Sequence, residues 1–316
     1  MKILITRRIH PEAVDLLKSR FEVDYSGQNE PFPRQRLIDT IGTYQGILSC
    51  VSEKFDSDLL WQAKSNLKII SNMAAGLDNI DTKTARMLGI EVRNTPDPVT
   101  ECTADFTMAL ALCLLRKIPE AQSYVLRSKW TAWDPEIFLG RTLRDLTWGI
   151  VGFGKIGRAV AARGFGFGCR IQYSDPYAEL DSLPPHLLAL KNVSLEELLR
   201  TSDIVSLHVP LTDETRHLID RRAFQAMKTT ALMINMARGP VVHTSDLVAA
   251  LRGRKIAGAA LDVFDPEPLS GDHDIFRCDR VIVVPHIGTA TAECRREMAI
   301  AAAQHLIDFF EREFKP

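Results

Sequence analysis

Short apolar runs alternate with longer amphipathic stretches along all 316 residues of the chain. Such runs are typical of buried parallel strands, and the stretches between them are typical of helices that cover a sheet. The first part of the chain predicts strands at 2–6, 21–25, 46–50, 68–71 and 90–93. The second part predicts strands at 148–152, 169–174, 203–209, 231–235, 258–263 and 281–284. This alternation favours an α/β fold, and the shared rhythm of the two series favours two doubly wound parallel sheets.

Helix signals fall between the predicted strands. Pro11 suits the first turn of one helix, and Gly89 suits the end of another. Two prolines in the segment 94–98 interrupt both helix and central strand, so we expect a hinge there. The apolar stretch that follows predicts one long helix from 101 to about 126, and a second subunit is a candidate to cover it. A last helix is predicted from 291 to about 314.

Charge and composition are those of an ordinary globular protein. The chain has 39 Lys and Arg against 40 Asp and Glu, a net charge of −1, and 46% hydrophobic residues. This near-neutral balance lacks the positive field of a nucleic-acid or membrane binder, so we expect neither partner. The longest apolar run, 108–115, is far shorter than the ~20 residues of a membrane span.

The cysteines and the acidic–histidine loop suggest no metal or disulfide framework. Six cysteines are scattered without CxxC spacing, which favours free thiols in a reducing cytoplasm over a reactive nucleophile. Asp272, His273 and Asp274 resemble metal ligands in composition, but they lie in a Gly-containing loop without partner spacing. We therefore expect a cytoplasmic protein without a metal.

A phosphate-binding turn follows the strand at 148–152. The segment Gly152-Phe153-Gly154-Lys155-Ile156-Gly157 is a GxGxxG between a predicted strand and a predicted helix. Its glycines allow a tight turn, a close approach of pyrophosphate and close helix packing, and the helix N-terminus favours the phosphate charge. Asp175 ends the next strand, where a carboxylate suits the ribose hydroxyls of NAD and repels the extra phosphate of NADP. The sequence therefore predicts NAD(H), with NADP(H) disfavoured.

Three later strands end in polar residues that suit reduction of a keto acid. They are Arg238 after 231–235, Glu267 after 258–263 and His286 after 281–284. In a parallel sheet, groups beyond the carboxyl ends of strands line the ligand crevice. Arg can clamp a carboxylate and polarise a neighbouring carbonyl, and His can deliver a proton to that carbonyl oxygen. A Glu bonded to the other imidazole nitrogen would orient the ring and favour its protonated form.

With these residues in place, the chain resembles the D-isomer-specific 2-hydroxyacid dehydrogenases along nearly its whole length. The resemblance rests on the glycine turn with Asp175 and on the segments around Arg238, Glu267 and His286. It rests also on the loop 74–81 and on Thr103-Ala104-Asp105. Within the family, 130–140 and 72–76 are similar to the glyoxylate/hydroxypyruvate reductase group. Trp130 and Trp133 could pack an interface or face the substrate.

The resemblance implies a role for each of these residues. Arg238 would bind the substrate carboxylate and carbonyl, His286 would be the acid/base, and Glu267 would be its partner. The backbone of Ala74, Ala75 and Gly76 would hold the substrate carboxylate. The cofactor would contact the glycine turn (Gly152, Phe153, Gly154, Lys155, Ile156, Gly157), Thr103, Asp175, Val209, Pro210 and Asp262.

The resemblance also implies an architecture. It gives a flavodoxin-like substrate domain from 1–98 plus 290–316, and a Rossmann NAD-binding domain from 99–289 that includes the long dimerisation helix. The active site would lie in the cleft between these domains, and the protein would be a homodimer. The implied reaction is reduction of a small 2-keto acid, with glyoxylate or hydroxypyruvate favoured, to the D-2-hydroxy acid.

Other readings stay open at this point. The same chemistry could act on a larger keto acid such as 2-ketogluconate, or on a phosphorylated hydroxy acid. A binding protein that senses NAD(H) could retain the same Arg, Glu and His. His243 stands where many relatives have Asp, which leaves the turn 240–245 less well defined by the resemblance.

Overall fold

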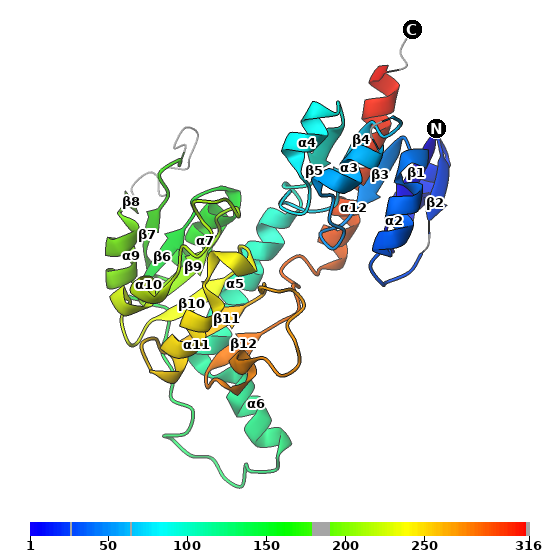
Figure 1. Ribbon diagram of the computed structural model, residues 1–316. Helices are drawn as coiled ribbons and strands as arrows, with labels where there is room; N and C mark the ends of the chain where they lie inside the picture. Colours follow the sequence, from blue (N-terminus) through cyan, green and yellow to red (C-terminus); the bar gives the residue numbers. More distant parts are fainter. Residues whose placement is uncertain (26, 64, 179–189, 314–316) are drawn as a thin grey trace. The chain divides into compact units, whose positions relative to one another are not determined.

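The structure is a computed structural model that describes residues 1–25, 27–63, 65–178 and 190–313. It divides into two compact units (Figure 1). Unit 1 comprises Met1–Val99 and Thr289–Pro316, and unit 2 comprises Thr100–Gly288. Each unit is built on its own parallel sheet, which confirms the predicted fold class of two doubly wound α/β domains.

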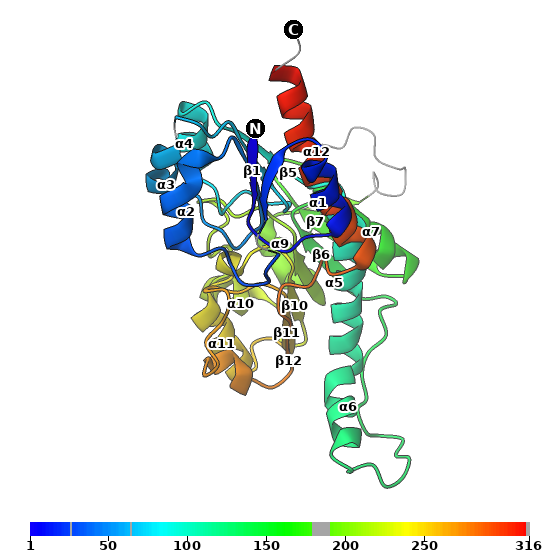
Figure 2. The same cartoon turned by 90° about the vertical axis from the view of Figure 1, so that its right-hand side faces the viewer.

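Unit 1 has a five-stranded sheet of order β2-β1-β3-β4-β5, which is the flavodoxin-like order. Its strands are β1 Lys2–Ile5, β2 Glu22–Tyr25, β3 Gly46–Ser49, β4 Ile69–Asn72 and β5 Glu91–Asn94. Its helices are α1 Pro11–Lys18, α2 Arg34–Thr40, α3 Ser57–Ala63, α4 Thr82–Met87 and α12 Ala292–Glu313, with a 3₁₀ turn η1 at Ile41–Thr43. The long C-terminal helix α12 packs beside α1 and against β3 and β4 (Figures 1 and 2). Residues from both ends of the chain therefore form the core of unit 1.

Unit 2 has a seven-stranded sheet of order β12-β11-β10-β9-β6-β7-β8. Counted along the chain from β6, this is the Rossmann order with one further strand at the β12 edge. Its strands are β6 Thr147–Val151, β7 Arg170–Ser174, β8 Lys191–Asn192, β9 Ile204–Leu207, β10 Leu232–Asn235, β11 Gly258–Leu261 and β12 Val281–Val283. Its helices are α5 Val99–Arg116, α6 Ile118–Leu126, α7 Lys155–Gly166, α9 Leu195–Thr201, α10 Arg221–Ala226 and α11 Thr244–Arg252, with 3₁₀ turns η2 Gly239–Val241 and η3 Asp274–Arg277.

Every predicted strand is present within two residues at each end. The central strands β3, β4, β9, β10 and β11 are buried along their whole length, which is why their sequences read as continuous apolar runs. Strand β8 was not predicted. Its two residues are both exposed at the sheet edge, so they carry no hydrophobic pattern.

The prediction of a single helix from 101 to 126 is wrong, because the helix is interrupted at Lys117. Lys117 has φ of +52°, and it separates α5 from α6. Pro119 lies in the first turn of α6, where it lacks an N–H and cannot sit against the carbonyl of Leu115 four residues earlier. That carbonyl instead accepts a hydrogen bond of 3.2 Å from the backbone N–H of Arg141.

Helix α6 and the loop after it form an arm, defined here as residues 117–140, that extends away from the sheet of unit 2 (Figure 2). Large apolar side chains are exposed along it, with 76% of Leu126 and 79% of Trp133 accessible. No residue of α6 is buried. Among the described helices, none is long and apolar enough to span a membrane.

Candidate functional site

The glycine turn between β6 and α7 has the backbone that a pyrophosphate site needs. Gly152 has φ of +89°, and a Cβ there would lie 2.8 Å from the carbonyl of His208. A Cβ on Gly157 would lie 2.1 Å from the carbonyl oxygen of Gly152, so only glycine lets α7 pack this closely. Gly154 has no atom within 4 Å of its Cβ position, so this face of the turn is open. The turn therefore fits a dinucleotide phosphate group at the N-terminus of α7.

Asp175 follows β7 and is held beside the glycine turn. Its Oδ2 accepts a hydrogen bond of 2.7 Å from the N–H of Phe153, and its Oδ1 accepts one of 2.8 Å from Tyr177. Each carboxylate oxygen keeps a further lone pair for a ribose hydroxyl. The Phe153 ring is buried and stacks on Tyr173 at 3.9 Å between centroids, so this residue faces the turn with its backbone alone.

The remaining predicted cofactor residues differ in their exposure to solvent and in how closely they approach the glycine turn. Val209 lies against it, since its Cγ1 is 2.9 Å from the Cβ position of Gly152. Pro210 follows, and its carbonyl accepts a hydrogen bond of 2.6 Å from Thr215. Lys155 is exposed and Ile156 is half-buried in the first turn of α7. Thr103 is buried within α5.

At the β12 edge of the same sheet, His286 and Glu267 form a close pair. The imidazole Nδ1 of His286 is 2.6 Å from Oε1 of Glu267, which leaves Nε2 for a substrate. The other Glu267 oxygen accepts a hydrogen bond of 3.2 Å from the N–H of Phe264. Burial alone would raise the pKa of Glu267, but the hydrogen bonds from His286 and Phe264 and the charge of Arg238 hold that pKa below its usual value.

The buried carboxylate of Asp262 fixes the turn that carries His286. Asp262 directly follows β11, and its two oxygens accept hydrogen bonds from the N–H groups of Ile287 at 2.7 Å and Gly288 at 2.8 Å. Burial raises the pKa of Asp262, and these two bonds oppose that shift. His286 itself has φ of +53°, an uncommon backbone conformation that this anchoring maintains.

The turn of Arg238 packs directly on the loop of Glu267. A Cβ on Gly239 would lie 1.8 Å from the carbonyl oxygen of Phe264, so the two backbones touch at this glycine. Behind it, Asn235 donates from Nδ2 to the carbonyl of Arg238 and accepts from the N–H of Ala237, both at 3.0 Å. The structure thus brings together Arg238, Glu267, His286 and Asp262, which three separate segments of the sequence carry.

In unit 1, the loop Ala74–Gly76 follows β4, and each of its three backbone carbonyls accepts a hydrogen bond. Ala74 O accepts from the N–H of Thr95 at 2.8 Å. Ala75 O accepts from Asn94 Nδ2 at 2.6 Å, and Gly76 O accepts from Asn72 Nδ2 at 3.1 Å. Within the described part of the chain, the N–H groups of Ala75 and Gly76 meet no acceptor. The loop is therefore a rigid pair of donors suited to a carboxylate.

The asparagines behind this loop were not identified from the sequence. Asn79 extends the network, since its Nδ2 donates to the carbonyls of Cys50 at 3.1 Å and Glu53 at 2.9 Å. It also accepts from Asn72 Nδ2 at 3.0 Å. An Asn at the carboxyl end of a strand is a weak signal by itself, because its partners come from other loops.

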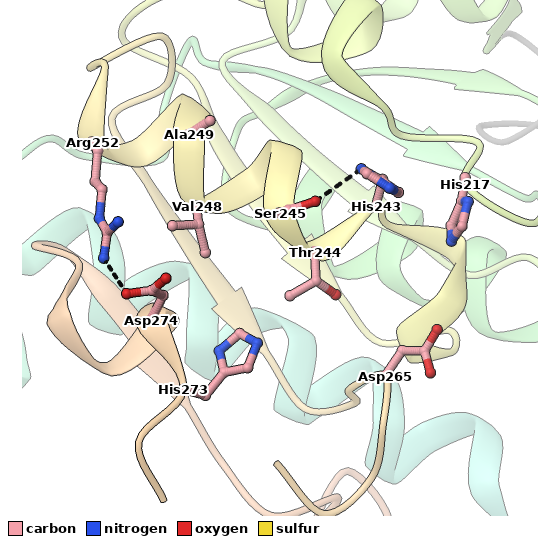
Figure 3. Close-up of a pocket in the computed structure, with 10 residues that line it drawn as sticks. All are labelled: His217, His243, Thr244, Ser245, Val248, Ala249, Arg252, Asp265, His273 and Asp274. Carbon is pink, nitrogen blue, oxygen red and sulfur yellow. Dashed lines mark hydrogen bonds and ion pairs between the residues drawn. The ribbon is translucent and has the colours of Figure 1, made fainter. Parts of the chain in front are cut away.

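A pocket of about 650 Å³ opens beside the loop of Glu267 without containing the predicted catalytic residues (Figure 3). It includes Asp265, from the loop that carries Glu267, and the imidazoles of His217, His243 and His273. His217 and His243 meet edge to face at 4.7 Å, and His243 Nδ1 is 2.7 Å from Asp246. Among the described residues, no group of three or more His, Cys, Asp or Glu is arranged to hold a metal ion.

A Rossmann sheet with this glycine turn, and with an Arg, a Glu–His pair and a buried Asp at one edge, defines a dinucleotide-dependent oxidoreductase. Residues 108–288 match the model of the D-isomer specific 2-hydroxyacid dehydrogenase, NAD binding domain. The chain belongs to this family. The resemblance inferred from the sequence is thereby confirmed, and so is NAD as the cofactor class.

The relatives match this chain over nearly their whole length. A glyoxylate reductase of Aeropyrum pernix is 41% identical over 319 residues, covering 100% of this chain and 94% of that protein. The crystal structure of the TT0316 protein of Thermus thermophilus is 40% identical with a TM-score of 0.90, covering 98% and 97% of the two chains. A D-lactate dehydrogenase of Aquifex aeolicus, complexed with NAD and lactic acid, is 29% identical with a TM-score of 0.84, covering 98% and 95%.

Proposed function

We propose that this oxidoreductase uses NADH to reduce glyoxylate or hydroxypyruvate to the corresponding D-2-hydroxy acid. The observation that carries the proposal is the His286–Glu267 pair, anchored by Asp262 and packed against the turn of Arg238. The substrate size rests on the relatives named glyoxylate reductase, which match this chain at about 40% identity from end to end.

In the proposed reaction, each residue acts on a defined part of the substrate. The guanidinium of Arg238 binds the carboxylate and polarises the keto oxygen. The backbone N–H groups of Ala75 and Gly76 hold the carboxylate as well. Nε2 of protonated His286 gives its proton to the keto oxygen, while Glu267 stabilises the imidazolium through Nδ1. When bound, NADH supplies the hydride that the carbonyl carbon receives.

Asp175 sets the preference for NADH over NADPH in this proposal. Its carboxylate already carries two backbone hydrogen bonds and stands where the ribose of the cofactor would lie. A 2′-phosphate there would meet a fixed negative charge. Replacing Asp175 with Ser is expected to raise the activity ratio of NADPH to NADH.

Further parts of the proposal concern organisation. Unit 1 is the substrate domain and unit 2, with the arm, is the cofactor domain. The exposed apolar side chains of the arm support a homodimer, since monomers rarely leave such a patch open. The cysteines of the described chain are all free thiols, which supports a cytoplasmic location.

The test is turnover by the purified protein with NADH or NADPH across glyoxylate, hydroxypyruvate, pyruvate, 2-ketogluconate and a branched keto acid. NADH-linked turnover of the first two supports the proposal. Turnover on larger acids alone would retain the chemistry and overturn the substrate. NADH binding without any turnover would favour a sensing protein.

Two variants test the residue roles. His286→Ala and Glu267→Gln should each lower kcat/KM by about 10²-fold or more, with the Kd for NADH little changed, because general acid catalysis is worth about 10²–10⁴-fold. Glu196→Gln, an exposed residue of α9, serves as the matched control. Wild-type turnover in His286→Ala would refute the assignment.

A further inference from the structure

A second pocket of unit 2 lies at the end of the sheet opposite to the catalytic residues. Its volume is about 740 Å³. Its walls include Leu232, Ala257 and Arg280, which stand at the amino-terminal ends of β10, β11 and β12. Arg238, Asp262 and His286 follow the carboxyl ends of the same three strands. The pocket is therefore separate from both the glycine turn and the His286–Glu267 pair.

The charged side chains of this pocket are almost all cations. They are Lys117, Arg141, Arg252, Arg254, Arg277 and Arg280, and the one acidic residue that lines the pocket is Asp279. Three of the cations have acidic partners: Arg141 pairs with Asp203 at 3.2 Å, and Arg252 and Arg277 pair with Asp274 at 2.7 Å and 3.6 Å. Such clustering costs electrostatic energy unless an anion is bound.

Three cations of the pocket lack a counter-charge. Within the described ranges, Lys117, Arg254 and Arg280 form no ion pair. The Nε of Arg280 is buried and, among described atoms, has no hydrogen-bond acceptor. A buried guanidinium N–H without an acceptor is unfavourable, and the side chain that carries it belongs to the wall of the pocket. An anion in the pocket would supply the counter-charge that these three cations lack.

The charged and apolar side chains that line the pocket indicate which class of anion it could bind. Guanidinium forks match phosphate oxygens in pairs, and several cations around one cavity require several negative charges. Carbon-rich walls come from Leu115, Leu232 and Ile256, which are buried, and from Leu139. The chain as a whole has a net charge of −1, which disfavours a long nucleic acid.

We propose that this pocket binds a small polyphosphate, either an inorganic chain or the phosphate chain of a nucleotide, on Lys117, Arg254 and Arg280. All three residues have left-handed backbone, with φ of +52°, +51° and +55°. Non-glycine residues pay a penalty for this conformation, which is maintained where the surrounding structure requires it. The site is additional to the NADH site, so it goes beyond the proposed reaction.

The experiment is calorimetric titration of the full-length protein, saturated with NADH, with tripolyphosphate at low salt. Saturation with NADH occupies the glycine turn and leaves this pocket as the proposed site. We expect binding that weakens steeply as salt is added. A titration with ATP in place of tripolyphosphate distinguishes the sources, because a nucleotide would bind more tightly if the apolar walls hold its base.

Arg254→Gly is the most informative variant. Arg254 follows the end of α11 with φ of +51°, a position that favours glycine, so the variant should fold at least as well as the wild type. Its affinity for tripolyphosphate should fall about tenfold, whereas Arg254→Lys should stay within about threefold. Lys117→Asn, which also suits left-handed backbone, should weaken binding similarly. Arg222→Gln, an exposed cation of α10, is the control and should bind normally.

Three results would overturn the proposal. They are an absence of binding to the NADH-saturated protein, an unchanged affinity in both Arg254→Gly and Lys117→Asn, and release of NADH by tripolyphosphate. The last would place the anion at the glycine turn. All of these readouts are independent of turnover, so they remain decisive if the proposed substrate is wrong.

Discussion

At the scale of single residues, His208 is a histidine that burial keeps neutral, so it cannot act as a proton donor near neutral pH. It follows β9 with its Nδ1 buried, and this burial lowers its pKa to about 3. Ser206 Oγ accepts the indole N–H of Trp148 at 2.9 Å and lies 3.0 Å from Nε2 of His208. The imidazole therefore shares a hydrogen bond with the serine hydroxyl through Nε2, and its low pKa keeps the ring neutral in the folded protein.

This neutral histidine makes stability depend on pH. In the unfolded chain its pKa is about 6.5, so between that pH and the folded value of about 3 the unfolded state binds one more proton. Stability should therefore fall with pH below 6.5, by up to about 1.4 kcal/mol per pH unit from this residue. His208→Gln should flatten the slope of the free energy of unfolding, measured in urea from pH 7.5 to 5.

The control for this measurement is His217→Gln, since His217 is exposed. Its slope should match that of the wild type. Parallel slopes for the wild type and His208→Gln would show that His208 takes up a proton in the folded protein.

Residues of the candidate site were predictable where one short segment carried the chemistry. The glycine turn, Arg238, Glu267 and His286 each follow a recognisable strand, and strand ends of a parallel sheet meet at one edge. Asn72, Asn79 and Asn94 were not predictable, because their partners lie in other loops and only the folded backbone brings them together. The anchoring of Ile287 and Gly288 by Asp262 was missed for the same reason.

At the scale of elements, the strands were easier to predict than the helix boundaries. Buried parallel strands appear as apolar runs, whereas the break at Lys117 depends on Pro119 and on the capture of the Leu115 carbonyl by Arg141. Proline in an apolar stretch signals a break, but tertiary contacts decide whether the helix kinks or separates into two.

The β6–α7 turn allows binding and stability to be separated by two similar substitutions. At Gly154 a Cβ enters open space, so Gly154→Ala should keep the melting temperature near wild type while it obstructs the pyrophosphate and weakens NADH binding. At Gly157 a Cβ would meet the Gly152 carbonyl at 2.1 Å, so Gly157→Ala should lose about 1–3 kcal/mol of stability as well. Calorimetry and thermal melting measure the two effects.

Gly166→Ala is the matched control for this pair. Gly166 lies in the last turn of the same helix, and its Cβ position has no atom within 4 Å. The change should leave NADH affinity unaltered and raise stability by up to about 1 kcal/mol through helix propensity. Normal NADH affinity in Gly154→Ala would contradict the assignment of this turn to pyrophosphate.

At the scale of the whole molecule, the arm is the part of the fold that the single chain leaves incomplete. The cores of the two sheets are closed by their own helices, whereas α6 has no buried residue. Leu126, Trp130 and Trp133 remain 76%, 62% and 79% exposed. The prediction of a covered apolar helix came from this same stretch of sequence, and its exposure in the single chain agrees with a second copy as the cover.

Charged or polar residues on the arm should therefore separate the proposed dimer. The double substitution Leu126→Lys and Trp133→Ser places a charge and a hydroxyl in the apolar patch, and sedimentation should show monomers where the wild type is dimeric. Met87→Lys is the control, because Met87 is 74% exposed at the end of α4, outside the arm. It should sediment as the wild type does. If the doubly substituted arm still sediments as a dimer, the subunits meet elsewhere and the exposed side chains of the arm have another purpose.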